Sequence, residues 1–237
     1  MTQKIILEKY LDALSHVIFP NTCAHCQTEI GRFEYYMCHA CWEAISHTHY
    51  EHYQDITTLD RLFFGRVHLQ STYSLFHFEE GNPIQSLLHT LKYHHQEKVG
   101  RYLGRILGEK LRIKSFPSPI DLVVPVPIHP KKEFHRGYNQ CDSICRGLAE
   151  TMKLPIDRKI LKKIKYNSSQ TKKSKWERLE NSKANFSVYK TLTPYQHILI
   201  VDDVITTGAT IESLGKLLVQ EYPSLKISVA SIAFSGK

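Results

Sequence analysis

The order of apolar and polar positions along this chain predicts strands and helices that alternate through most of its length. Residues 72–81 (TYSLFHFEEG) alternate between apolar and polar side chains and end at Gly81, a pattern typical of a strand at the edge of a sheet. Residues 82–113 carry leucines and isoleucines at helical spacing, which predicts one or two helices. Because Gly100, Gly104 and Gly108 fall on one face of that pattern, we expect another element to pack closely there.

A second series of elements follows. Residues 119–130 (PIDLVVPVPIHP) form a β-branched run that ends in prolines, which indicates a strand over 121–127 buried on both faces and followed by a constrained loop. The remaining predicted elements are a helix over 139–153, a strand over 197–203, a helix over 211–220 and a strand over 226–234. This alternation predicts an α/β domain with a parallel central sheet, in which ligands bind at the carboxyl ends of the strands.

The chain of 237 residues is 42% hydrophobic, which suits a globular protein with a sizeable core. We predict a small module over 1–60 and a larger domain over 61–237. Residues 1–20 read as an amphipathic helix interrupted by charges, with no signal peptide, and no apolar run approaches the roughly 18 residues that span a bilayer. A cytoplasmic location is therefore expected.

Charge is concentrated in one segment. The formal net charge is +8. Residues 158–183 hold ten lysines and arginines against two glutamates, so this segment accounts for the whole excess. Such a segment can track a nucleic-acid backbone, with Trp176 and Tyr166 available for base stacking, or it can be a solvated flap over an active site. The pattern leaves both open.

Four of the six cysteines form two CxxC pairs, Cys23/Cys26 and Cys38/Cys41, separated by eleven residues. This spacing is close to that of a zinc ribbon, in which two thiolate-bearing turns complete a closed tetrahedral and structural site. A redox CxxC or two disulfides are the competing interpretations, and His25 or His39 could replace a cysteine ligand. Cys141 and Cys145, four apart on a predicted helix, are expected in the core.

The stretch HILIVDDVITTGATIESLGKLL (197–218) places two acids and a threonine-rich turn between a strand and a helix. A helix start presents free amides and a partial positive charge, which suits a phosphate, and Gly208 lets the backbone approach it. Asp202 and Asp203 would repel a bare phosphate but would accept hydrogen bonds from sugar hydroxyls. A ribose 5-phosphate group fits both halves. No Walker loop and no GxGxxG after a strand is present.

The run ILIVDDVITTGAT resembles the phosphoribosyl pyrophosphate (PRPP) motif of type I phosphoribosyltransferases. Together with VVPVPIHPKKEFHRGYNQ (123–140), SQTKKSKWERLENSKANF (169–186) and the double CxxC, it makes nearly the full chain similar to the ComF family of competence-associated, amidophosphoribosyltransferase-like proteins. The resemblance implies a type I phosphoribosyltransferase fold with an N-terminal zinc module.

The resemblance also implies roles. Asp202 and Asp203 would hold the ribose hydroxyls, and His129 and Arg136 would lie where related enzymes bind pyrophosphate. The 5-phosphate would be bound by the loop residues Thr206, Thr207, Gly208, Ala209 and Thr210. Lys172, Lys173 and Arg178 would belong to a loop that closes over the substrate, with Lys172 and Lys173 foremost in stabilising the departing pyrophosphate. Arg136 would make bidentate contacts with the phosphate oxygens. Magnesium would bridge pyrophosphate and ribose oxygens.

Three functions agree with these residues. The first is a PRPP-binding protein that acts in DNA uptake during natural transformation, a role implied by the resemblance alone. The second is an active phosphoribosyltransferase with an unidentified nitrogen acceptor, and the third is a PRPP sensor without chemistry. Expected partners are PRPP, single-stranded DNA and a competence helicase or channel protein.

Overall fold

The computed structural model describes residues 21–31, 34–93, 96–164 and 185–236. Four strands form a parallel sheet in the order β1-β6-β5-β2. Their bounds are Ser71–His77 for β1, Leu122–Pro125 for β2, His197–Ile205 for β5 and Lys226–Phe234 for β6. The predicted parallel α/β domain is confirmed, and the strand that begins at Ser71 does lie at an edge.

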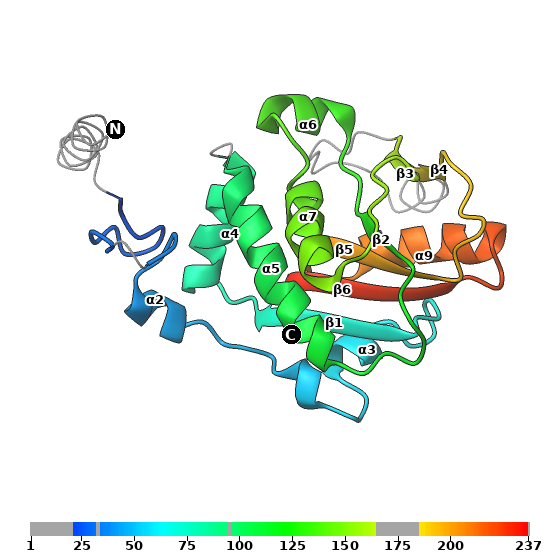
Figure 1. Ribbon diagram of the computed structural model, residues 1–237, viewed down its shortest axis with the longest axis horizontal. Coiled ribbons are helices and arrows are strands. Elements are labelled where there is room, and N and C mark those ends of the chain that lie inside the picture. The colour runs from blue at the N-terminus through cyan, green and yellow to red at the C-terminus, as the bar shows by residue number, and fades with distance from the viewer. Residues whose placement is uncertain (1–20, 32–33, 94–95, 165–184, 237) are drawn as a thin grey trace, which may run out of the picture.

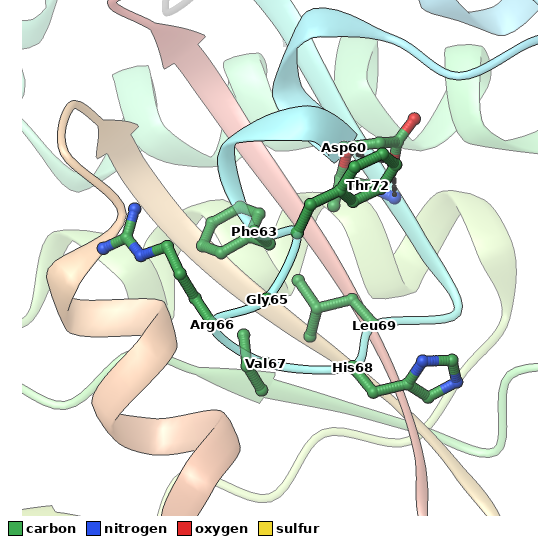
Figure 2. A pocket seen from close by; sticks show the side chains of 9 residues that line it. Asp60, Phe63, Gly65, Arg66, Val67, His68, Leu69 and Thr72 are labelled. Atoms are coloured by element: carbon green, nitrogen blue, oxygen red, sulfur yellow. Dashed lines mark hydrogen bonds between the residues drawn. The ribbon is translucent and has the colours of Figure 1, made fainter.

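Helices cover both faces of this sheet (Figure 1). The larger helices are α4 (Pro83–Tyr93), α5 (Glu97–Ile113), α7 (Gln140–Met152) and α9 (Ala209–Glu221). Figure 2 shows α9 on one face, with the sheet between it and helices on the other face. Because both faces are covered, the five central residues of β1 are all buried, and the alternation predicted for it is absent.

Smaller elements complete the fold. They are α2 (His39–Glu43), η1 (Tyr50–His52), α3 (Thr58–Leu62), α6 (Pro130–Arg136), and the hairpin of β3 (Leu161–Lys163) and β4 (Phe186–Val188). The loop predicted after β2 is thus a helix, because His129 caps its first turn and Pro130 fixes its start. The boundary expected at residue 60 stays a prediction; α3 spans it. Among the described residues, no helix has the length and apolarity to cross a membrane.

The glycine stripe on α5 is the contact surface for α7, as predicted. A Cβ at Gly104 would lie 2.0 Å from the carbonyl oxygen of Ile144, and one at Gly147 would lie 1.9 Å from the carbonyl oxygen of Arg101. The two helix backbones therefore touch, and side chains at these positions would force them apart. This close contact supports Gln140 and Cys141, which begin α7 beneath the acid pair.

We expect Gly104→Ala to destabilise the protein by about 3 kcal/mol or more, because an immobile backbone atom occupies the space of the new methyl group. Gly108→Ala is the variant for comparison: its Cβ would lie 2.8 Å from Cβ of Thr151 and 3.1 Å from the carbonyl oxygen of Leu148, so it should also destabilise the protein, but less, because both distances are longer than the 2.0 Å at Gly104. Urea unfolding of both measures the difference. A Gly104→Ala protein as stable as Gly108→Ala would contradict the close contact.

Candidate functional site

The two acids of the opening motif lie near the carboxyl end of β5. Asp202 and Asp203 are 9% and 7% exposed and belong to the strand, which continues to Ile205, two residues beyond the predicted end. Helix α9 likewise begins at Ala209 rather than 211. A single turn, 206–208, therefore connects the strand that carries the acids to the helix start.

Asp203 is held by contacts from three elements. Its Oδ2 lies 2.9 Å from Nζ of Lys92 on α4 and 3.4 Å from Nε2 of Gln140 on α7, and its Oδ1 accepts the Val204 amide at 2.9 Å. Burial, the largest single influence, would raise the pKa of Asp203, but the Lys92 ammonium, together with hydrogen bonds from Asp202 and the Val204 amide, holds the pKa below its ordinary value. Asp203 is therefore the ionised member of the pair.

Asp202 has a different environment. Its Oδ1 accepts the Asp203 amide at 2.9 Å and lies 3.5 Å from Sγ of Cys141. Burial, followed by the charge of Asp203, raises the pKa of Asp202 to about 8. Two adjacent buried carboxyl groups cannot both ionise easily, so near neutral pH the pair carries roughly one negative charge. Cys141 and Cys145 are buried in the core, as predicted.

The residues predicted to form a phosphate loop surround the start of α9. Gly208 is the N-cap, with φ of 71°, and no side chain caps the helix. Thr206, Thr207 and Ala209 are exposed, while Thr210 is half-buried. The first amides of α9 thus have no intrahelical acceptor, which is the arrangement that binds a phosphate at a helix start.

An arginine distant in sequence supports this loop. Arg66 donates from Nη1 to the Thr207 carbonyl at 2.8 Å and from Nη2 to Glu212 of α9 at 2.6 Å. Figure 2 shows its guanidinium directed away from the Phe63–Leu69 loop toward the segment that joins β5 to α9. Phe63 packs beside Gly208, so the N-terminal part of the chain shapes the phosphate loop. Nothing in the sequence pattern singled out Arg66 or Lys92.

The segment after β2 connects to the acid pair. Nδ1 of His129 accepts the Lys131 amide at 3.1 Å, and Gly137 ends α6 in the left-handed conformation. Arg136 donates from Nη1 to Oε1 of Gln140 at 2.9 Å, and Gln140 contacts Asp203. The structure therefore brings Arg136 into one network with the acids. Lys172, Lys173 and Arg178, with Tyr166, Lys175 and Trp176, lie outside the described residues, between β3 and β4.

A cavity of about 780 Å³ adjoins the phosphate loop at the carboxyl ends of β1 and β6. Thr206 and Thr207 form one wall, and the other residues that line it are Thr58, Arg61, Leu62, His77, Phe234, Ser235 and Gly236. A space of this size is ample for a small organic molecule. It lies on the side of β5 opposite to β2 and Arg136.

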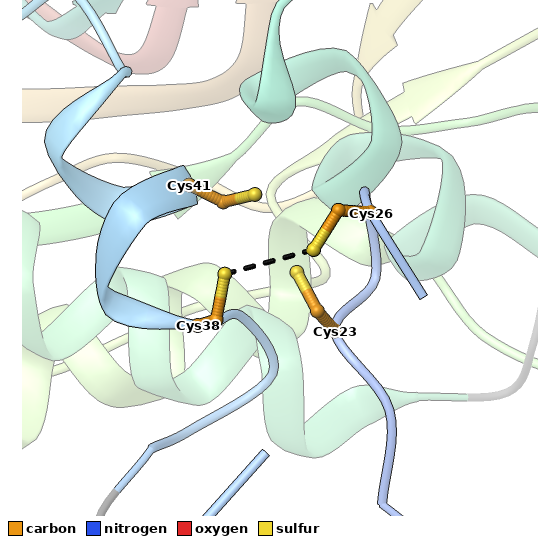
Figure 3. Close-up of side chains that lie close together, drawn as sticks. All are labelled: Cys23, Cys26, Cys38 and Cys41. Carbon is orange, nitrogen blue, oxygen red and sulfur yellow. Dashed lines mark hydrogen bonds between the residues drawn. The ribbon is translucent and has the colours of Figure 1, made fainter. Parts of the chain in front are cut away.

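The four cysteines of the two CxxC pairs converge (Figure 3). One ligand atom from each lies within 4.8 Å of all the others, and the sulfurs of Cys26 and Cys38 are 3.6 Å apart. A tetrahedral ion with bonds of about 2.3 Å to sulfur requires sulfur separations of roughly 3.8 Å. A hydrogen bond from Thr28 lowers the pKa of the Cys26 thiol to about 6, which favours a thiolate. This cluster can hold a metal ion.

The cysteine cluster is attached to the larger domain by aromatic side chains. Tyr35, Tyr36 and Trp42 each lie with their ring centroids 5.6–5.9 Å from that of Tyr102 on α5. His25 also hydrogen-bonds Ser86 of α4, with 3.0 Å between Nδ1 and Oγ. Because these residues flank the cysteines, an ion bound there would fix them against α4 and α5.

Comparisons with known proteins agree with this geometry. The phosphoribosyl transferase domain family matches residues 142–236, from α7 through β6. Competence protein F of Haemophilus influenzae is 29% identical over 208 residues, which is 86% of each chain. DNA utilization protein YhgH of Salmonella typhi is 30% identical over 58% of this chain and 62% of its own. Competence protein ComFC of Bacillus subtilis is 30% identical over 48% of this chain and 45% of its own.

The parallel sheet, the acid pair and the phosphate loop together define a domain of the type I phosphoribosyltransferase fold. The similar proteins and the four cysteines near the N-terminus indicate one particular group of proteins within this fold. The similarity to Competence protein F, YhgH and ComFC supports a protein of the ComF family, with a phosphoribosyltransferase domain and an N-terminal cysteine cluster.

Proposed function

We propose that this protein binds PRPP through the acid pair and the phosphate loop and acts in the handling of DNA during competence. The observation that carries PRPP binding is the placement of Asp202 and Asp203 one turn before the free amides of α9. Carboxylates at that distance can accept the ribose hydroxyls while the amides bind the 5-phosphate. Competence rests on the names of the relatives, Competence protein F and ComFC.

Arg136 and the segment around His129 would bind the pyrophosphate of the same ligand. Arg136 is a suitable donor because a guanidinium makes two parallel hydrogen bonds to phosphate oxygens. Magnesium would enter with PRPP, bound by pyrophosphate and ribose oxygens. The four cysteines would hold zinc, the ion whose preferred geometry matches four thiolates. Single-stranded DNA and a helicase or channel protein stay predictions, since the basic residues expected to contact DNA lie outside the described part.

The test is calorimetric titration of the metal-loaded protein with PRPP and magnesium. We expect saturable binding that the Asp202→Asn/Asp203→Asn variant loses by a factor of about 100 or more, because charged hydrogen bonds contribute roughly 1.5–3 kcal/mol each. Asp157→Asn, which removes a carboxylate paired with Lys190 in another part of the fold, is the control and should bind as wild type does. Wild-type protein that gives no binding heat with PRPP would refute the proposal.

The cavity beside Thr206 and Thr207 favours a second candidate, an active phosphoribosyltransferase, because it offers space for an organic acceptor beside the loop proposed to bind the 5-phosphate. An acceptor nitrogen would form a bond to C1 while the bond from C1 to pyrophosphate oxygen breaks. Pyrophosphate would leave with the electron pair, and the acceptor would lose a proton. Arg136 and Lys172 would stabilise the leaving group. A protein that binds PRPP and releases no pyrophosphate with any nitrogen acceptor would instead be a sensor.

A further inference from the structure

Lys92 is a charged residue of the site that neither the sequence motifs nor the resemblance assigned. It lies in the last turn of α4, and its Nζ is 2.9 Å from Oδ2 of Asp203. The Asp203 side chain is 9% exposed and that of Lys92 is 27% exposed, so water screens this ion pair poorly. An ion pair of this kind contributes strongly to the state of the buried carboxylate.

The backbone of Lys92 is also tied to the site. The carbonyl of Leu91 accepts a hydrogen bond from the hydroxyl of Tyr138, a buried residue of the segment that follows α6. The same segment leads into α7, whose Gln140 contacts the same Asp203 oxygen as Lys92 does. Two separate elements thus present donors to Oδ2 of Asp203, and Tyr138 holds them in register.

The two carboxylate oxygens of Asp203 have different partners. Oδ1 accepts the amide of Val204 within the strand, and Oδ2 is shared by Lys92 and Gln140. Oδ2 is therefore the oxygen whose direction and charge depend on side chains. Without a cation beside it, a carboxylate next to Asp202 in this buried strand would be protonated more easily, and a protonated carboxyl group accepts hydrogen bonds from hydroxyl groups more weakly than a carboxylate does.

We propose that Lys92 is a positioning residue for ribose recognition, the counter-ion that keeps Asp203 charged and directed at the ribose hydroxyls of PRPP. This inference rests on the proposed PRPP binding and adds to it a residue from α4. It assigns Lys92 an action through Asp203 rather than direct contact with the pyrophosphate.

The experiment compares Lys92→Met and Lys92→Arg in the metal-loaded protein, titrated separately with PRPP and magnesium, ribose 5-phosphate, and inorganic pyrophosphate. We expect Lys92→Met to weaken PRPP and ribose 5-phosphate by about 30-fold or more, the effect of truncating one partner of a buried charge pair. Pyrophosphate affinity should change by less than about threefold. Lys92→Arg should restore most of the ribose 5-phosphate affinity, because it keeps the charge.

Lys110→Met is the matched control. Nζ of Lys110 lies 2.7 Å from Oε1 of the buried Glu51, and the Lys110 side chain is 29% exposed. The Lys110→Met variant therefore loses a similar ion pair outside the site and should bind all three ligands as wild type does. Thermal unfolding checks that each variant is folded. If Lys92→Met does not fold, Lys92→Gln replaces it, since an amide can still hydrogen-bond Asp203 without its charge.

The outcomes separate this inference from the proposed function. Wild-type protein that binds no PRPP refutes both. Wild-type protein that binds PRPP while Lys92→Met binds ribose 5-phosphate equally well overturns the inference alone. The inference is also overturned if Lys92→Met loses affinity for pyrophosphate rather than for ribose 5-phosphate, because Lys92 would then act on another part of the ligand. It is overturned as well if Lys92→Arg binds ribose 5-phosphate as weakly as Lys92→Met does, because the shape of the lysine rather than its charge would then matter.

Discussion

Removal of the zinc ion proposed for the four-cysteine cluster is expected to release the aromatic contact with α5 and to unfold residues 21–31 and 34–45. The described part of this module is small, and its buried residues include two of the cysteines themselves, Cys23 and Cys41. Structural zinc contributes on the order of 10 kcal/mol to modules of this size, more than such a small core supplies. The phosphoribosyltransferase domain, with its own core, should stay folded.

The measurement is Trp42 fluorescence in a Trp176→Phe background, followed during chelation and in a Cys38→Ser variant. Trp42 lies 5.9 Å from Tyr102 and 6.4 Å from Phe76 between ring centroids, so loss of the contact should shift its emission to longer wavelength. Cys145→Ala removes a buried thiol elsewhere and should retain one zinc per chain. An unchanged Trp42 spectrum in metal-free protein would show that the metal does not hold the module.

Gly208→Ala is expected to abolish most PRPP binding while it destabilises the fold only moderately. Gly208 has φ of 71°, which costs a residue with a Cβ roughly 1–2 kcal/mol, and the new Cβ would lie 2.8 Å from Cε1 of Phe63. Relief of that contact requires movement of the turn that carries Thr206 and Thr207. Because the amides of this turn and of the α9 start must converge on one phosphate, we expect the affinity for PRPP to fall by about 100-fold.

Gly65→Ala is the control for this variant. Gly65 has φ of 69°, and a Cβ there would meet no atom within 4 Å. Gly65→Ala, in the loop that also carries Arg66, therefore has the same unfavourable backbone conformation as Gly208→Ala but no steric contact at the new Cβ. Calorimetric titration with PRPP should therefore separate the two variants, while urea unfolding should show a loss of roughly 1–2 kcal/mol in Gly65→Ala and a larger loss in Gly208→Ala, which adds the contact with Phe63. Equal PRPP affinities in the two would argue against the loop as the phosphate site.

Local sequence determined those parts of this protein in which neighbouring residues act together. The parallel sheet follows from apolar runs that alternate with helical patterns, and the close contact of α5 and α7 follows from glycines four apart on one face. Two CxxC pairs at short spacing are enough to predict one cluster. The acids and the phosphate loop lie in a continuous run, 202–210, so their proximity in space is dictated by one strand, one turn and one helix start.

The tertiary structure alone decided which other side chains act on that run. Arg66 and Glu212 are 146 residues apart in sequence, and Lys92 and Gln140 reach Asp203 from two different helices. A lysine in the last turn of a helix or an arginine in a loop carries no local pattern that sets it apart from other surface charges. Its role arises only when packing removes water and leaves a buried carboxylate or an open carbonyl as its partner, because electrostatic interactions become strong where the dielectric is low. The sequence therefore predicts the ligand of this site, and the fold defines how the charge of its acid pair is balanced.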